Sequence, residues 1–121
     1  FVKGTQGFVT SDLDGTIEIV FDEVTSLNSS MTGVVLEANI YIGDTSYETG
    51  EGIEIFYKTA DGLGDPIISY VESTIEKGTW LSASGNIPAD KLVSGNIVVR
   101  MKNSSNSEMI FLDYIAIKGI P

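Results

Sequence analysis

The stretch "GNIVVRMKNSSNSEMIFLDYIAIKGI", residues 95–120, decides the fold class, because two apolar runs flank one polar loop in it. In the first run Ile97, Val99 and Met101 face one way, and Arg100 lies among the residues that face the other way. Such alternation is typical of a β-strand with one buried face. The second run, "MIFLDYIAI", is apolar at odd and even positions alike. It therefore predicts a central strand that is covered on both sides.

The same period of two recurs in four other runs, at residues 17–21, 35–41, 53–58 and 67–72. Turn-forming segments such as "DLDG", "LNSSMTG" and "ADGLGDP" separate the runs. About eight short strands joined by polar loops predict an all-β fold, an antiparallel two-sheet β-sandwich of the jelly-roll type. The segment "GFVTS" predicts a short edge strand, and Pro88 predicts the start of one helical turn.

Composition limits the classes of function that the chain can have. Its 121 residues suit a single domain, 1–121, and an opening without Met or a long apolar run suggests a piece excised from a larger protein. A net charge of −10 argues against nucleic acid and anionic membranes as partners. The absence of Cys and His excludes disulfides, thiolate metal sites, and Ser-His-Asp or Cys-His catalysis.

A candidate ligand-binding face arises if four of the alternating strands share one sheet. Aromatic rings offer flat apolar surface to a sugar ring, and Arg, Glu and Asn offer donors and acceptors to its hydroxyl groups. The predicted ligand-binding residues on this concave face are Glu37, Asn39, Tyr41, Phe56, Lys58, Tyr70, Glu72 and Arg100. The alternative is that Arg100 only neutralises Glu37 or Glu72, with Tyr70 packed beside them.

Three motifs follow one another along residues 76–117: "GTWLSASGNIPA", "SGNIVVRMKN" and "IFLDYIAI". Together they resemble the second half of galactose-binding-like jelly rolls, the fold of many carbohydrate-binding modules. The resemblance implies glycan binding without catalysis, in an accessory module of an enzyme or in a surface or phage tail or baseplate protein. Several of these families bind a structural calcium ion through an early Glu-x-Glu strand and the closing Asp, and Asp113 matches that Asp, although the opening segment lacks a clear Glu-x-Glu. Phe111 stands where members with a sugar site at the loop rim often carry Asn, which argues against that rim site.

Two other aromatic residues have two interpretations each. The resemblance places Trp80 at a strand start, which favours burial beneath the sheet over exposure as a sugar platform. Tyr47, in the loop "GDTSYETGEG", either clasps a ligand or pins the loop to the sandwich. The acidic segments "DLDG" and "ADGLGD" are read first as turns and only second as calcium loops.

The sequence thus predicts a non-catalytic module that binds a cell-wall or surface polysaccharide, outside the cell or on a virion. An enzyme is not expected, because a shallow sheet face lacks the deep site that paired carboxylates need for glycoside hydrolysis. No cofactor is expected beyond the calcium ion that the resemblance implies. The alternative is a structural or protein-interaction sandwich of a phage tail, baseplate or bacterial surface protein, because protein interfaces also favour Tyr, Phe and Arg.

Overall fold

A computed structural model describes residues 8–10, 15–25, 27–43, 51–71, 77–103 and 110–120 of the chain. These residues form eight strands: β1 (Phe8–Thr10), β2 (Gly15–Val20), β3 (Thr32–Ile42), β4 (Gly52–Lys58), β5 (Ile68–Val71), β6 (Trp80–Asn86), β7 (Asn96–Asn103) and β8 (Ile110–Ile120). The predicted helical turn is the 3-10 helix η1 (Ala89–Lys91), which follows Pro88. Within the described ranges this helix is far too short to cross a lipid bilayer.

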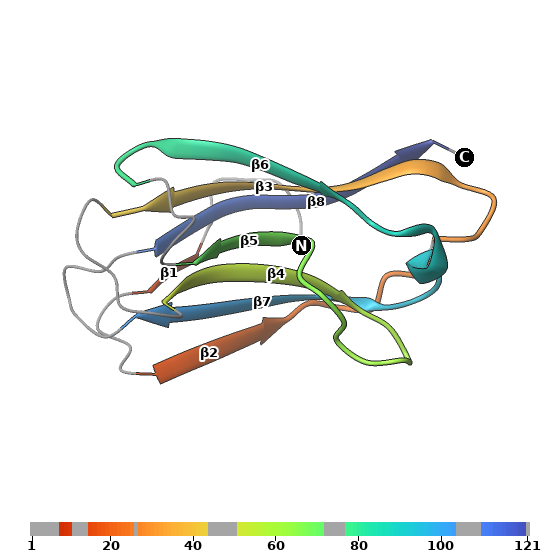
Figure 1. Ribbon diagram of the computed structural model, residues 1–121, viewed down its shortest axis with the longest axis horizontal. Coiled ribbons are helices and arrows are strands. Elements are labelled where there is room, and N and C mark those ends of the chain that lie inside the picture. The colour runs from red at the N-terminus through yellow and green to blue at the C-terminus, as the bar shows by residue number, and fades with distance from the viewer. Residues whose placement is uncertain are drawn as a thin grey trace.

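The strands form two antiparallel sheets, with the order β1-β8-β3-β6 in sheet A and β2-β7-β4-β5 in sheet B. Figure 1 shows β6, β3 and β8 in the upper part of the view and β4, β7 and β2 in the lower part. The predicted all-β two-sheet sandwich and its short edge strand, β1, are confirmed. Pairing is nested, since β1 pairs with β8, β2 with β7, β3 with β6 and β4 with β5. This order is compatible with a jelly roll, which stays a prediction.

The two strands of the 95–120 stretch belong to different sheets. β7 lies between β2 and β4 in sheet B, and β8 lies between β1 and β3 in sheet A. The predicted central position of the last strand is confirmed. The two strands therefore do not form a hairpin, and each contributes one long side of the core.

β8 carries a bulge at Asp113. Leu112 pairs with Ile40 of β3, and Tyr114 pairs with Asn39, so that Asp113 is an extra residue between the two pairs. The bulge shifts the phase of the strand, and its inward residues are Ile110, Leu112, Ile115 and Ile117. This shift explains why the run is apolar at both odd and even positions. The predicted cover over the outer side is wrong, because Asp113 and Lys118 are exposed there.

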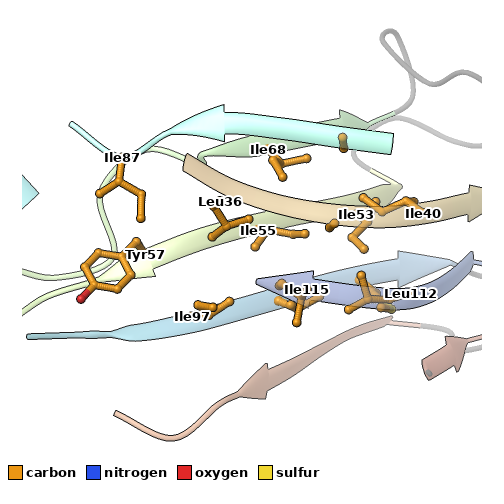
Figure 2. Packing of buried hydrophobic residues seen from close by; sticks show 14 of the residues in the cluster. Leu36, Ile40, Ile53, Ile55, Tyr57, Ile68, Ile87, Ile97, Leu112 and Ile115 are labelled. Atoms are coloured by element: carbon orange, nitrogen blue, oxygen red, sulfur yellow. The ribbon is translucent and has the colours of Figure 1, made fainter. Parts of the chain in front are cut away.

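The inner faces of the two sheets enclose one apolar core. β3 contributes Val34, Leu36, Ala38, Ile40 and Ile42, none of which is more than 2% exposed. Sheet B contributes Ile53, Ile55, Tyr57, Ile97, Val99 and Met101. Figure 2 shows Leu36, Ile40, Leu112 and Ile115 from sheet A and Ile53, Ile55 and Ile97 from sheet B filling the space between the sheets. Each such side chain contributes about 1.5–3 kcal/mol on burial, which fixes the opposite residues of each strand on the outer face.

The Tyr57 hydroxyl predicts a loss of stability at alkaline pH. It donates a hydrogen bond to the Val93 carbonyl oxygen at 2.5 Å. Burial and the nearby charge of Glu23 raise the pKa of Tyr57 above its ordinary value of 10.0. The folded state therefore favours the neutral phenol, and its advantage is complete below pH 10.0 and lost as the pH rises through the folded-state pKa.

Tyr57→Phe should lose about 1 kcal/mol at neutral pH, because the hydrogen bond is removed. Its free energy of unfolding should also decline less at alkaline pH, because Phe has no hydroxyl group to ionise. Urea unfolding of both proteins across the alkaline range, together with tyrosinate absorbance, measures this. Parallel declines of both proteins would contradict the assignment to Tyr57.

Candidate ligand-binding face

The predicted ligand-binding residues do not share one face. β3 belongs to sheet A, whereas β4, β5 and β7 belong to sheet B. The prediction of a single face is therefore wrong, because alternation assigns a residue to one side of its strand and does not say which sheet holds the strand. The outer face of sheet A carries Glu37, Asn39 and Tyr41, and that of sheet B carries Phe56, Lys58 and Arg100.

Tyr70 lies on the inner side of β5. It pairs with the buried Ile53 and packs against the core. Its predicted position on the outer side, beside Arg100, is wrong, because β5 begins at Ile68, which is buried opposite Ile55, and Tyr70 lies on the same side of the strand as Ile68. Glu72 and Tyr47 lie outside the described residues, so nothing here places them.

Arg100 faces a carboxylate on the neighbouring strand β2. Its Nε and Nη2 donate to Glu18 Oε2 at 3.0 and 2.5 Å, and its guanidinium lies 5.3 Å from the centre of the Phe56 ring. The predicted alternative of a neutralising carboxylate is right in kind, but the partner is Glu18 rather than Glu37 or Glu72. Phe56 is 4% exposed, so its ring offers little surface to a ligand.

This arrangement predicts that Arg100→Ala lowers stability by only about 1 kcal/mol, because exposed ion pairs and cation–π contacts are individually weak. The side chains of Arg100 and Glu18 are 37% and 45% exposed. Urea unfolding of Arg100→Ala, Glu18→Gln and the double variant gives the coupling between them. A loss above about 3 kcal/mol in Arg100→Ala would mean that the pair is buried in solution.

The outer face of sheet A carries three aromatic side chains in one row across the strands. Tyr41 on β3 pairs in register with Trp80 on β6 and with Phe111 on β8. The ring centres of Tyr41 and Trp80 lie 5.6 Å apart, those of Tyr41 and Phe111 5.9 Å, and those of Trp80 and Phe111 6.4 Å. The rings support one another at the distances typical of aromatic pairs.

Trp80 is the most exposed ring of this row. It is 56% exposed, so its predicted burial beneath the sheet is wrong. It does begin a strand, but its neighbour Leu81 takes the inward position and Ala83 follows two residues later. Exposure of an indole to water is unfavourable, and the fold alone does not require it. The row is therefore a candidate for function.

Most side chains in the next rows of the same face are polar. Asn39 pairs with Ser82 on one side and Tyr114 on the other, and in the row after it Glu37 pairs with Ser84 and Ala116. Consecutive rows lie about 7 Å apart, because two strand residues separate them. The face therefore passes from aromatic to hydroxyl and amide groups over about 14 Å between Tyr41 and Glu37.

One ion pair marks the polar end of the face. Lys118 Nζ lies 3.0 Å from Glu37 Oε1. This hydrogen bond, the charge of Glu37 and the nearby Tyr114 raise the pKa of Lys118 above its ordinary value. Both partners are exposed enough to exchange hydrogen bonds with a ligand, since 63% of the Lys118 side chain and 35% of the Glu37 side chain are accessible.

Chemically, the face can stack on an apolar ring and exchange hydrogen bonds with hydroxyl groups. Within the described ranges no three Asp or Glu side chains gather as a metal-binding cluster. Asp113, the residue that the resemblance assigns to calcium, stands exposed at the bulge of β8. The calcium site stays a prediction, as does the absence of catalysis.

Cavities also occur away from this face. One of about 300 Å³ is lined by Phe21, Asp22, Val24, Leu27, Met31, Ile97 and Ile115 among others. Another of about 360 Å³ lies beside η1, between Gly64, Pro66 and Lys91. Neither combines an exposed aromatic ring with aligned polar groups, as the outer face of sheet A does.

The sequence contains a further signal for this face in the run that forms β6. In "WLSASGN" Trp80, Ser82 and Ser84 alternate with Leu81 and Ala83. This run is a strand with a small inner face and a polar outer face on which Trp80 lies. The contributions of Phe111, Tyr114 and Lys118 were hidden by the phase shift at the bulge.

Comparison of the chain with protein-family models, curated proteins and solved structures gave no match.

Proposed function

We propose that the domain is a non-catalytic carbohydrate-binding module that binds a cell-wall or surface polysaccharide on the outer face of sheet A. The observation that carries the proposal is the exposed Trp80, aligned with Tyr41 and Phe111 and flanked by the row of Asn39 and its neighbours. In this proposal the module acts outside the cell or on a virion, where such polysaccharides occur, and is tethered to other domains. The resemblance of residues 76–117 to galactose-binding-like jelly rolls supports the same reading.

The proposed chemistry combines two interactions of different character. The apolar CH face of a sugar ring packs on the indole of Trp80, which is large and rigid and so loses little entropy on binding. Hydroxyl groups of the next sugar then replace water on Asn39 and Ser82, which each provide donors and acceptors. Because the site is a surface rather than a pocket, the affinity should be modest.

A second candidate is a protein-interaction domain of a phage tail, baseplate or bacterial surface protein. The observation that favours it is the same exposed indole, since Trp and Tyr are the residues that most often anchor protein interfaces. Against it stand the small polar side chains of β6, which give a protein partner little apolar area. The two candidates differ in what binds the face, not in which face is used.

A glycan array that includes bacterial cell-wall polysaccharides tests the proposal. The domain is fused to a fluorescent reporter and applied with and without calcium, beside Trp80→Ala and Arg100→Ala. Selective binding that Trp80→Ala loses and Arg100→Ala keeps is the expected result. A blank array with correctly folded protein would refute the proposal and direct the search to a protein partner.

A further inference from the structure

We infer that the outer face of sheet A takes a single, uncharged, solvent-exposed polysaccharide chain that lies along β3, and not the flat surface of an insoluble polysaccharide. This inference rests on the proposed function and specifies its ligand. Three observations support it: the angles between the rings, the chemistry of the rows, and the charge of the protein.

The rings of the aromatic row are not coplanar. The plane of Tyr41 is inclined by 50° to that of Trp80 and by 77° to that of Phe111, and Trp80 and Phe111 are inclined by 59°. A flat crystalline surface contacts several rings at once only if they lie in one plane. Here a flat ligand can lie against one ring at a time, and Trp80 is the ring that is 56% exposed. Tyr41 and Phe111 instead hold the indole in place.

The rows beside the aromatic row are mostly polar, and among the described residues Tyr114 on β8 is the one ring that the strand pairing places there. Ser82 and Ser84 continue the outer side of β6 from Trp80, and Asn39 and Glu37 continue that of β3 from Tyr41. A platform for a crystalline surface would repeat aromatic rings along the strands. Hydroxyl, amide and carboxylate groups can instead form hydrogen bonds with the hydroxyl groups along the edges of a single chain. Those hydroxyl groups are hydrated before the chain binds. The rows span about 14 Å from Tyr41 to Glu37, enough for several sugar rings laid end to end.

The charge of the protein selects against negatively charged chains. The protein carries a net charge of −10, which repels a polyanion over about one Debye length. Lys118 is held by Glu37 at 3.0 Å, so its charge is already compensated. Asp113 is exposed beside Tyr114 on β8 and adds a further negative charge. An uncharged chain is not repelled by the negative charges of the protein. It can also form hydrogen bonds with both Lys118 and Glu37.

The test compares three kinds of glycan by calorimetry and co-sedimentation. The uncharged probes are cello-, xylo-, manno- and laminari-oligosaccharides of graded length. The insoluble probes are microcrystalline cellulose and chitin, and the anionic probe is polygalacturonate. We expect at least one uncharged series to bind, with an affinity that rises about tenfold or more from the disaccharide to the longest oligomer. Trp80→Phe should retain most of this binding, and Trp80→Ala should weaken it roughly thirtyfold.

The outcomes separate the inference from the function on which it rests. Binding to the crystalline powders that Trp80→Ala abolishes would overturn the single chain but leave the carbohydrate-binding function standing. Binding to polygalacturonate that Lys118→Ala abolishes would overturn the uncharged ligand in the same way. An affinity that does not change with oligomer length would overturn the placement along β3. Absence of binding to every probe would overturn both the inference and the function.

Discussion

Trp80→Ala is expected to weaken glycan binding roughly thirtyfold, which corresponds to about 2 kcal/mol, while the fold remains intact. The reason for the loss is that the indole supplies the largest exposed apolar surface of the face, and it stands in register with Tyr41 at its side. Removal of a central aromatic anchor commonly costs this much at a binding site. The fold should be unaffected because Trp80 is 56% exposed and lies outside the core.

The measurement is isothermal titration with the glycan that the array identifies, with thermal unfolding as the check on the fold. Trp80→Phe is the matched variant, since it keeps a stacking ring and should lose much less affinity. Arg100→Ala is the control on the opposite sheet and should bind as the wild type does. If Trp80→Ala and wild type bound with equal affinity, the face of sheet A would not be the site.

Gly52→Ala is expected to destabilise the fold strongly, by about 3 kcal/mol or more. Gly52 opens β4 with a φ of +140°, a conformation that side chains with a Cβ rarely adopt. A Cβ there would overlap the Tyr70 carbonyl oxygen and lie 2.8 Å from Val71 Cα, both of which belong to the backbone of β5. Neither backbone atom can move without disturbing the pairing of β4 with β5.

Gly62→Ala provides a matched control for this effect. Gly62 has a φ of +111°, but nothing lies within 4 Å of the position that its Cβ would take. Its substitution should therefore cost only the backbone strain, on the order of 1 kcal/mol. Thermal unfolding should place the Tm of Gly52→Ala roughly 10 °C or more below wild type, and Gly62→Ala between the two. Equal Tm values for both variants would mean that β5 does not approach Gly52 in solution.

The alternation of apolar residues predicted the strands of the sandwich well. Leu36, Ala38 and Ile40 on β3 and Ile97, Val99 and Met101 on β7 all lie in the core as their spacing indicated. These positions were predictable because a strand with one buried face places an apolar residue at every second position. Pro88 likewise marked the start of η1 through its fixed φ.

The composition of the candidate site could not be predicted in the same way. Whether β3 and β7 share a sheet depends on long-range pairing, for which the local pattern carries no information. Two local irregularities added to this: the bulge at Asp113 reversed the phase of β8, and the start of β5 at Ile68 placed Tyr70 inside. Glu18 was missed as the partner of Arg100 because only the register between β2 and β7 brings them together.

The nested strand order has a consequence for how the chain folds during its synthesis. Phe8 on β1 pairs with Leu112, and Thr32 on β3 pairs with Ile120, so that the pairs of sheet A join early strands to the last strand, β8. β8 is the strand that joins β1 to β3, and it is also the last of the eight strands to be made. Until it leaves the ribosome, β1 has no neighbour and β3 has only β6. Sheet A should therefore form only after β8 has been made, and folding should be slow for a domain of this size, because loop closure must precede the contacts that stabilise it.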